Sequence, residues 1–231
     1  MKLYISTRRI IIWLISLVVS LNLIGFIGRG VENYLGYERT TPFVRLFHVT
    51  GEGNITSWFS SLILLFSAIV LLVIAKTVSA RGGPYIKHWY ALSIIFAYLA
   101  LDEAASIHEL TMDPLRNLLH PTGIFHFAWV IIAIPLVLLF VIVYIKFLFH
   151  LPNDTRWLFL IGGFLYVFGA MGMDMIAGFV LDNDLVQGRL YGLLITIEEF
   201  LENVGIVTFI YALLFYLTSH LEIQEISVEL S

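Results

Sequence analysis

The sequence predicts an all-α integral membrane protein, a bundle of six transmembrane helices. Hydrophobic residues make up 59% of the 231 residues and charged residues only 13%, whereas soluble domains are usually about 45–50% apolar and about 25% charged. The apolar residues also gather in six separate runs, each close to the roughly 20 residues that a helix needs to cross a bilayer. No polar segment is long enough for a second domain, so we expect one membrane domain over residues 1–218.

The six runs are separated by segments that favour turns. Five of the six prolines lie between runs, where helix breakers are expected, and Pro135 lies inside the fourth run. The first run is too long for a signal peptide and carries no Ala-x-Ala cleavage site. The expected spans are residues 10–28, 55–75, 88–108, 124–149, 157–181 and 190–217.

The distribution of basic residues predicts the orientation. Eight Lys and Arg residues lie on the side of the N-terminus and five on the opposite side, so the positive-inside rule places both termini of this multi-pass protein in the cytoplasm. The longest connection, residues 29–53, is then an external loop or a lid that folds back on the bundle. Residues 219–231 form an acidic cytoplasmic tail.

Ionisable residues occur inside three of the expected spans, where a charge costs free energy and marks a candidate functional site. These spans contain no Lys or Arg, so protons or metal ions must balance the acidic side chains. Seven carboxylates and one histidine are involved: Asp102, Glu103, His108, Glu109, Asp174, Glu198, Glu199 and Glu202.

Depth and helical periodicity predict that these side chains meet. With both termini in the cytoplasm, all three groups fall in the outer half of the membrane. At about 100° per residue, Asp102, Ser106 and Glu109 share one helix face, and Glu198, Glu199 and Glu202 share another. The face that carries Asp174 also presents small residues, which allow neighbouring helices to approach closely; these are Gly163, Ala170, Ala177 and Gly178.

A metal site is the interpretation that explains why several ligands would converge. Carboxylates with one or two imidazoles suit iron, manganese or zinc, and the absence of cysteine excludes thiolate ligands. We expect one or two divalent ions held by Asp102, His108, Glu109, Asp174, Glu198 and Glu202.

Other residues leave alternatives open. His126 or His48 could supply a second imidazole, and Glu52 or Asn54 could reach inward, although Asn54 is also a good N-cap for the second span. His108 could instead be a neutral histidine paired with a neighbouring carboxylate.

The function predicted from these residues is a membrane metalloenzyme, a hydrolase or oxidase, that acts on a lipid or another hydrophobic small molecule. Glu199 and Glu103 would serve as general acid or base. The alternatives are a proton- or metal-ion-coupled transporter or channel, and a membrane subunit of a larger complex. The enzyme is favoured because the acids lie in one half of the membrane and because no span other than that of Pro135 looks interrupted.

Partners follow from the same composition. The net charge of −4 and the lack of a basic patch exclude nucleic acid as an expected partner. Membrane lipid and a hydrophobic substrate are the expected contacts, and the sequence leaves the oligomeric state open.

Overall fold

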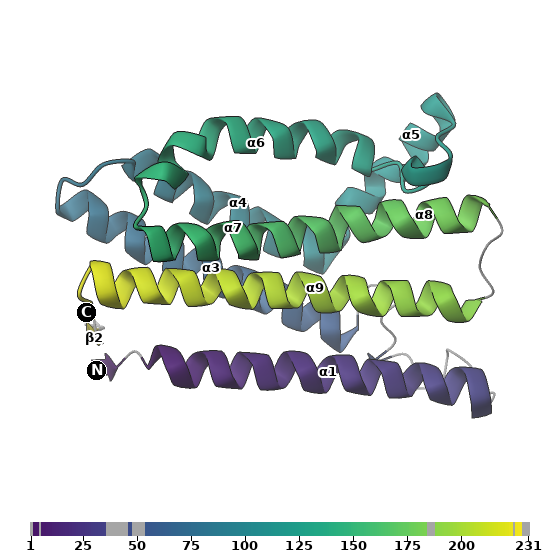
Figure 1. Ribbon diagram of the computed structural model, residues 1–231, viewed down its shortest axis with the longest axis horizontal. Coiled ribbons are helices and arrows are strands. Elements are labelled where there is room, and N and C mark those ends of the chain that lie inside the picture. Colours follow the sequence, from purple (N-terminus) through teal and green to yellow (C-terminus); the bar gives the residue numbers. More distant parts are fainter. Residues whose placement is uncertain are drawn as a thin grey trace.

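The computed structural model describes residues 2–4, 6–35, 46–47, 54–183, 188–223 and 225–227. Within these residues the chain is almost entirely helical, and the long helices lie side by side along the longest axis of the molecule (Figure 1). The α-helices are α1 (Thr7–Leu35), α3 (Ile55–Ala80), α4 (Ile86–Ala105), α5 (Met112–Leu119), α6 (Val130–His150), α7 (Asn153–Val167), α8 (Asp174–Asp182) and α9 (Gly188–Phe215).

Short helical segments of other types interrupt or join the α-helices. Two are 3-10 turns, η1 (His108–Thr111) and η2 (Gly123–Phe125). Two are π-helical, η3 (Phe168–Met173) and η4 (Tyr216–His220). Because η3 joins α7 directly to α8, residues 153–182 form one long helix with a π-helical segment near its middle.

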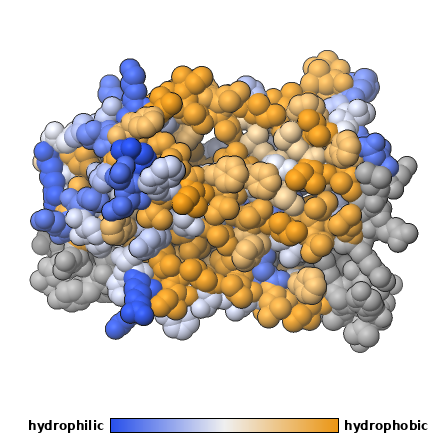
Figure 2. All heavy atoms as spheres, viewed as in Figure 1, coloured by the Kyte–Doolittle hydropathy of each residue, from blue (hydrophilic) through white to orange (hydrophobic). Residues whose placement is uncertain are grey.

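Five helical stretches in the described part of the chain are long and apolar enough to cross a membrane, which is consistent with a multi-pass membrane protein. A sixth is added if α4 and the segment His108–Leu119, which are bent by 76° relative to each other, count as one span. Figure 2 shows a broad hydrophobic band across the molecule with hydrophilic residues towards its ends. The five continuous stretches are Thr7–Gly28, Ile55–Ala80, Val130–His150, Asn153–Asp182 and Leu190–His220.

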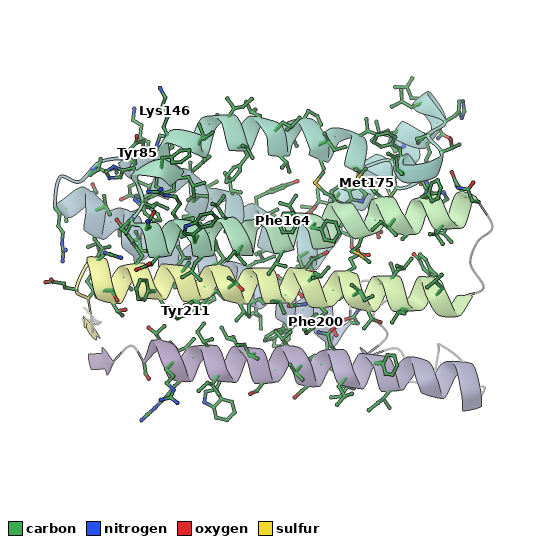
Figure 3. All side chains as sticks on the ribbon, viewed as in Figure 1. Tyr85, Lys146, Phe164, Met175, Phe200 and Tyr211 are labelled. Carbon is green, nitrogen blue, oxygen red and sulfur yellow. The ribbon has the colours of Figure 1, made fainter. Side chains whose placement is uncertain are left out.

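The two ends of the chain meet at one end of the bundle. Strand β1 (Lys2–Tyr4) pairs antiparallel with β2 (Glu225–Ser227), so that Lys2 lies opposite Ser227. Both termini therefore lie at the same end in Figure 1, and Tyr85 and Lys146 lie at that end in Figure 3.

In the described part of the chain, a hydrophobic core joins α1, α3, α4, α6, α7 and α9. Leu71 and Ile74 of α3 pack with Ile210 and Leu213 of α9, and all four side chains are fully buried. Trp89 of α4 adds an edge-to-face ring contact with Phe147 of α6, with 4.8 Å between ring centroids. Apolar side chains thus fill the space between helices far apart in the sequence.

Among the expected boundaries that differ from the structure, three concern the loop after α1 and the candidate site. Helix α1 continues to Leu35, so the expected loop over 29–53 begins later, and residues 36–45 and 48–53 lie outside the described residues. The helix expected over 88–108 ends at Ala105, because Ser106 adopts a left-handed conformation with φ of 52°. The span expected from residue 124 begins at Val130, because 124–129 form η2 and a turn.

Candidate functional site

Asp102 and His108 form a contact across the turn that ends α4. One carboxylate oxygen of Asp102 accepts a hydrogen bond from the backbone N–H of His108 at 2.8 Å, and the other lies 3.0 Å from Nδ1 of the His108 ring. The carboxylate therefore closes the turn and orients the imidazole. The prediction that Asp102, Ser106 and Glu109 share one helix face is wrong, since the helix ends before Ser106.

Asp174 is the most buried of the predicted acidic residues, with 8% of its surface exposed. It is the first residue of α8, directly after the π-helical segment η3. The indole N–H of Trp129 donates a hydrogen bond to Asp174 Oδ2 at 2.8 Å, and the ring of His108 lies 5.0 Å from that of Trp129. Asp174 also interacts electrostatically with His108, Glu109 and His126.

His126 is held in the same way as His108, by the carboxylate of Asp182, which lies outside the predicted site. Its Nδ1 lies 2.5 Å from Asp182 Oδ1, and the other oxygen of Asp182 accepts the backbone N–H of Gly123. Gly178 makes this approach possible, because a Cβ there would lie 2.8 Å from the Cβ of His126. Asp182 was missed because it ends an apolar run and resembles ordinary loop sequence.

The glutamates of α9 interact with the acidic residues of α4 and α8. Glu202 has electrostatic interactions with Glu103, Glu198, Glu199 and Asp174, and Glu198 interacts with Asp174 and Glu103. Oε2 of Glu198 is buried without a hydrogen-bond partner among the described residues. Figure 3 places Met175 and Phe200, the neighbours of Asp174 and Glu199, in the half of the bundle away from the termini.

Glycines bring η3 and the end of α7 into direct contact with α9 at this level. A Cβ on Gly169 would lie 2.8 Å from Cγ of Glu202, and a Cβ on Gly205 would lie 2.6 Å from the backbone nitrogen of Tyr166. Gly163, expected to mediate such packing, is exposed and has open space around it. That expectation placed residues at about 100° intervals around a continuous α-helix. The π-helical segment η3 changes this spacing, so Gly163 and Asp174 no longer share one face.

Uncharged polar residues also belong to this region. Ser60 of α3 donates a hydrogen bond to Oδ1 of the buried Asn203 at 3.0 Å, and Nδ2 of Asn203 donates to the carbonyl of Glu199 at 2.9 Å. The charge pattern of the sequence does not point to Ser60 or Asn203, because neither side chain is ionisable. Asn54 caps α3 by accepting the backbone N–H groups of Thr56 and Ser57 at 2.7 and 3.0 Å, which confirms the N-cap alternative.

The described residues contain no group of three or more His, Asp or Glu side chains arranged to hold a metal ion. The metal site therefore stays a prediction, and His48 and Glu52 lie outside the described residues.

The expectation that only the span of Pro135 is interrupted is wrong. The third span bends at Ser106, beside Asp102 and His108, and the fifth contains η3 next to Asp174.

The fold and these contacts define a class: helical proteins with several candidate membrane spans and two Asp–His pairs around a buried aspartate. Residues 10–217 match the model of a family described as Domain of unknown function (DUF8692), and the chain belongs to this family. No curated protein and no solved structure matches the chain.

Proposed function

We propose that this protein is an integral membrane enzyme with both termini in the cytoplasm, and that it uses a divalent metal to act on a lipid or another hydrophobic substrate. One observation carries the proposal: His108 and His126 are each oriented by a carboxylate at Nδ1, and both interact electrostatically with the buried Asp174. The three side chains come from three separate parts of the chain.

The orientation of the two imidazoles is what a metal ligand requires. When Nδ1 donates its hydrogen to a carboxylate, Nε2 keeps its lone pair and can bind a metal ion, and metal-binding histidines usually have such a partner. Two imidazoles and one carboxylate suit iron, zinc or manganese. The proposed ligands are therefore His108, His126 and Asp174, while Asp102 is reassigned from ligand to the residue that orients His108.

Metal binding would draw these side chains closer together. No three of them meet at coordination distance among the described residues, so the proposal includes a rearrangement of side chains that keeps both Nδ1 contacts. Helix α9 could supply a further metal ligand, because Oε2 of Glu198 is buried and has no hydrogen-bond partner in the described part of the chain. Glu109, Glu198 and Glu202 are the remaining candidate ligands.

Acid–base chemistry is assigned to Glu103 and Glu199. A bound metal ion would activate a water molecule or polarise a substrate oxygen, and a nearby carboxylate would accept or return the proton. Glu103 interacts electrostatically with both Glu198 and Glu202, so the charge on one of these carboxylates affects the other two. Ile176, Phe179 and Phe200, close in sequence to Asp174 and Glu199, are exposed, so a hydrophobic substrate would meet apolar surface on the same helices.

A transporter of protons or metal ions is the second candidate. It is favoured by the bend at Ser106 and by η3, because ion pathways often use discontinuous helices and π-helical segments are frequent at functional sites. Both interruptions lie next to candidate residues, Asp102 and Asp174.

Metal content and stability test the proposal. Protein purified without chelator should contain iron, manganese or zinc by elemental mass spectrometry, and chelation should lower its melting temperature, since a ligand that binds only the native state stabilises it. Asp174→Asn and His126→Gln should lose the metal. His120→Gln is the matched control, because His120 is exposed six residues away.

Two outcomes would overturn the metalloenzyme. Wild-type protein that purifies without metal and melts at the same temperature with chelator or added metal has no structural metal site. Uptake of protons or metal ions by proteoliposomes, abolished by Asp174→Asn, would establish the transporter instead.

A further inference from the structure

A groove lies on the side of the bundle between α1 and the end of α9, at the end where the termini meet. Its volume is about 460 Å³, and it is open to the outer surface of the bundle. Tyr211, one of the lining residues, lies on the side of α9 that faces α1 (Figure 3). The lining residues are Thr7, Arg8, Ile11, Ile12, Tyr211, Phe215 and Thr218.

The lining changes from polar to apolar along the helices. Thr7 and Arg8 open α1, and Thr218 lies in η4, so these side chains form one end of the groove. Ile11 and Ile12 follow about one turn further along α1, and Phe215 and Tyr211 lie about one and two turns back along α9. The groove therefore has a polar mouth followed by an apolar floor, just as a lipid has a polar headgroup followed by apolar acyl chains.

The mouth carries positive charge from two sources. The side chain of Arg8 is exposed there, and the N-terminus of α1 adds the partial positive charge of the helix dipole. This end of the bundle also holds most of the basic residues of the chain, among them Arg9, Lys76 and Lys146. Anionic lipids gather in the cytoplasmic leaflet, which is where the positive-inside rule places this end.

We propose that this groove binds an anionic glycerophospholipid, with its phosphate at Arg8 and one acyl chain along Ile11, Ile12 and Phe215. A soluble anion would not use the apolar floor, and the groove opens sideways between two candidate spanning helices whose outer residues, such as Trp13, are exposed and apolar. The site lies at the opposite end of the bundle from the Asp–His pairs and is independent of them.

Native mass spectrometry of the full-length protein, released from mixed micelles of phosphatidylglycerol and phosphatidylcholine, tests this assignment. Wild-type protein should retain one phosphatidylglycerol at least tenfold more often than phosphatidylcholine. Arg8→Gln should lose that preference, and Arg9→Gln should keep it, because Arg9 does not line the groove. Equal retention of the two lipids by the wild type, or an unchanged preference in Arg8→Gln, would overturn the proposal.

A second pair of variants tests the apolar floor without changing charge. Ile12→Trp should fill the groove and reduce retention of phosphatidylglycerol at least tenfold, whereas Ile15→Trp, exposed on the same helix but outside the groove, should not. Equal retention in both variants would overturn the placement of the acyl chain. Inorganic phosphate that competes with the lipid to the same extent in wild type and Ile12→Trp would show a site for a free anion instead.

Discussion

The indole N–H of Trp129 donates a hydrogen bond to the carboxylate of Asp174 at 2.8 Å. This bond joins the turn before α6 to the first residue of α8, 45 positions away in the sequence. The ring of Trp129 also lies 5.0 Å from that of His108. Trp129 therefore contacts both the buried aspartate and one of the two Asp–His pairs, and it fixes their relative positions.

Replacing Trp129 by Phe should destabilise the protein, because it removes the donor that balances the buried Asp174. Loss of one partner of a buried hydrogen bond costs about 1–3 kcal/mol, which thermal unfolding in detergent can resolve. Trp157→Phe is the control, since Trp157 is 62% exposed and its loss should leave the melting temperature nearly unchanged. Equal melting temperatures for Trp129→Phe and the wild type would show that this bond does not stabilise the site.

Asp182 should hold the turn around Gly123 and His126 against α8. Asp182→Ala removes the acceptor for both the Gly123 N–H and the His126 ring. Amide hydrogen exchange over residues 120–127 should then become faster, while exchange in the core helix α3 should not change. Asp154→Ala, at the exposed start of α7, is the control. Unchanged exchange at 120–127 would mean that the packing at Gly178 alone holds this turn.

Hydropathy alone located most of the long apolar helices, because the length of an apolar run in a membrane protein follows from the thickness of the bilayer. The local break at Ser106 could not be found in this way. It depends on Asp102 accepting the backbone N–H of a residue six positions later, and such a bond competes with a regular helix without changing the hydropathy. The sequence predicts Asp102 as a metal ligand, and its hydrogen bond with the backbone of His108 was not foreseen.

The faces of the helices were harder to predict than their positions. A wheel of about 100° per residue assumes that every turn is α-helical, and η3 breaks this assumption between Gly163 and Asp174. Gly178, on the expected face, does approach the turn at His126 closely, whereas Gly162 and Gly169 approach α9 from outside that face. Residues 36–45 and 48–53 lie outside the described residues, so the proposed lid remains a prediction.

The orientation can be tested with single cysteines, because the natural sequence has none. Lys2→Cys and Glu225→Cys should react with a membrane-impermeant maleimide from the same side, since β1 and β2 pair with each other. Leu118→Cys, in the exposed part of α5, should react only from the other side if α4 and α5 complete a crossing. Reaction of positions 2 and 118 from the same side would show that α4 and α5 do not complete a crossing. As a positive control, detergent-solubilised protein should react at all three positions.

Gly169→Ala should damage the contact between η3 and α9 that places Asp174 beside the glutamates. A Cβ at this position would lie 2.8 Å from Cγ and 2.9 Å from the backbone nitrogen of Glu202, and the backbone atom cannot turn away as a side chain does. Overpacking of this kind costs about 1–3 kcal/mol, so the melting temperature should fall, and bound metal should fall with it if the ligands depend on this spacing. Gly163→Ala is the matched control, because its Cβ would meet open space and Ala favours a helix over Gly by about 1 kcal/mol. If both variants melt at or above the wild-type temperature, close packing of η3 against α9 at Gly169 does not stabilise the protein. The electrostatic interaction between Asp174 and Glu202 then does not depend on this packing.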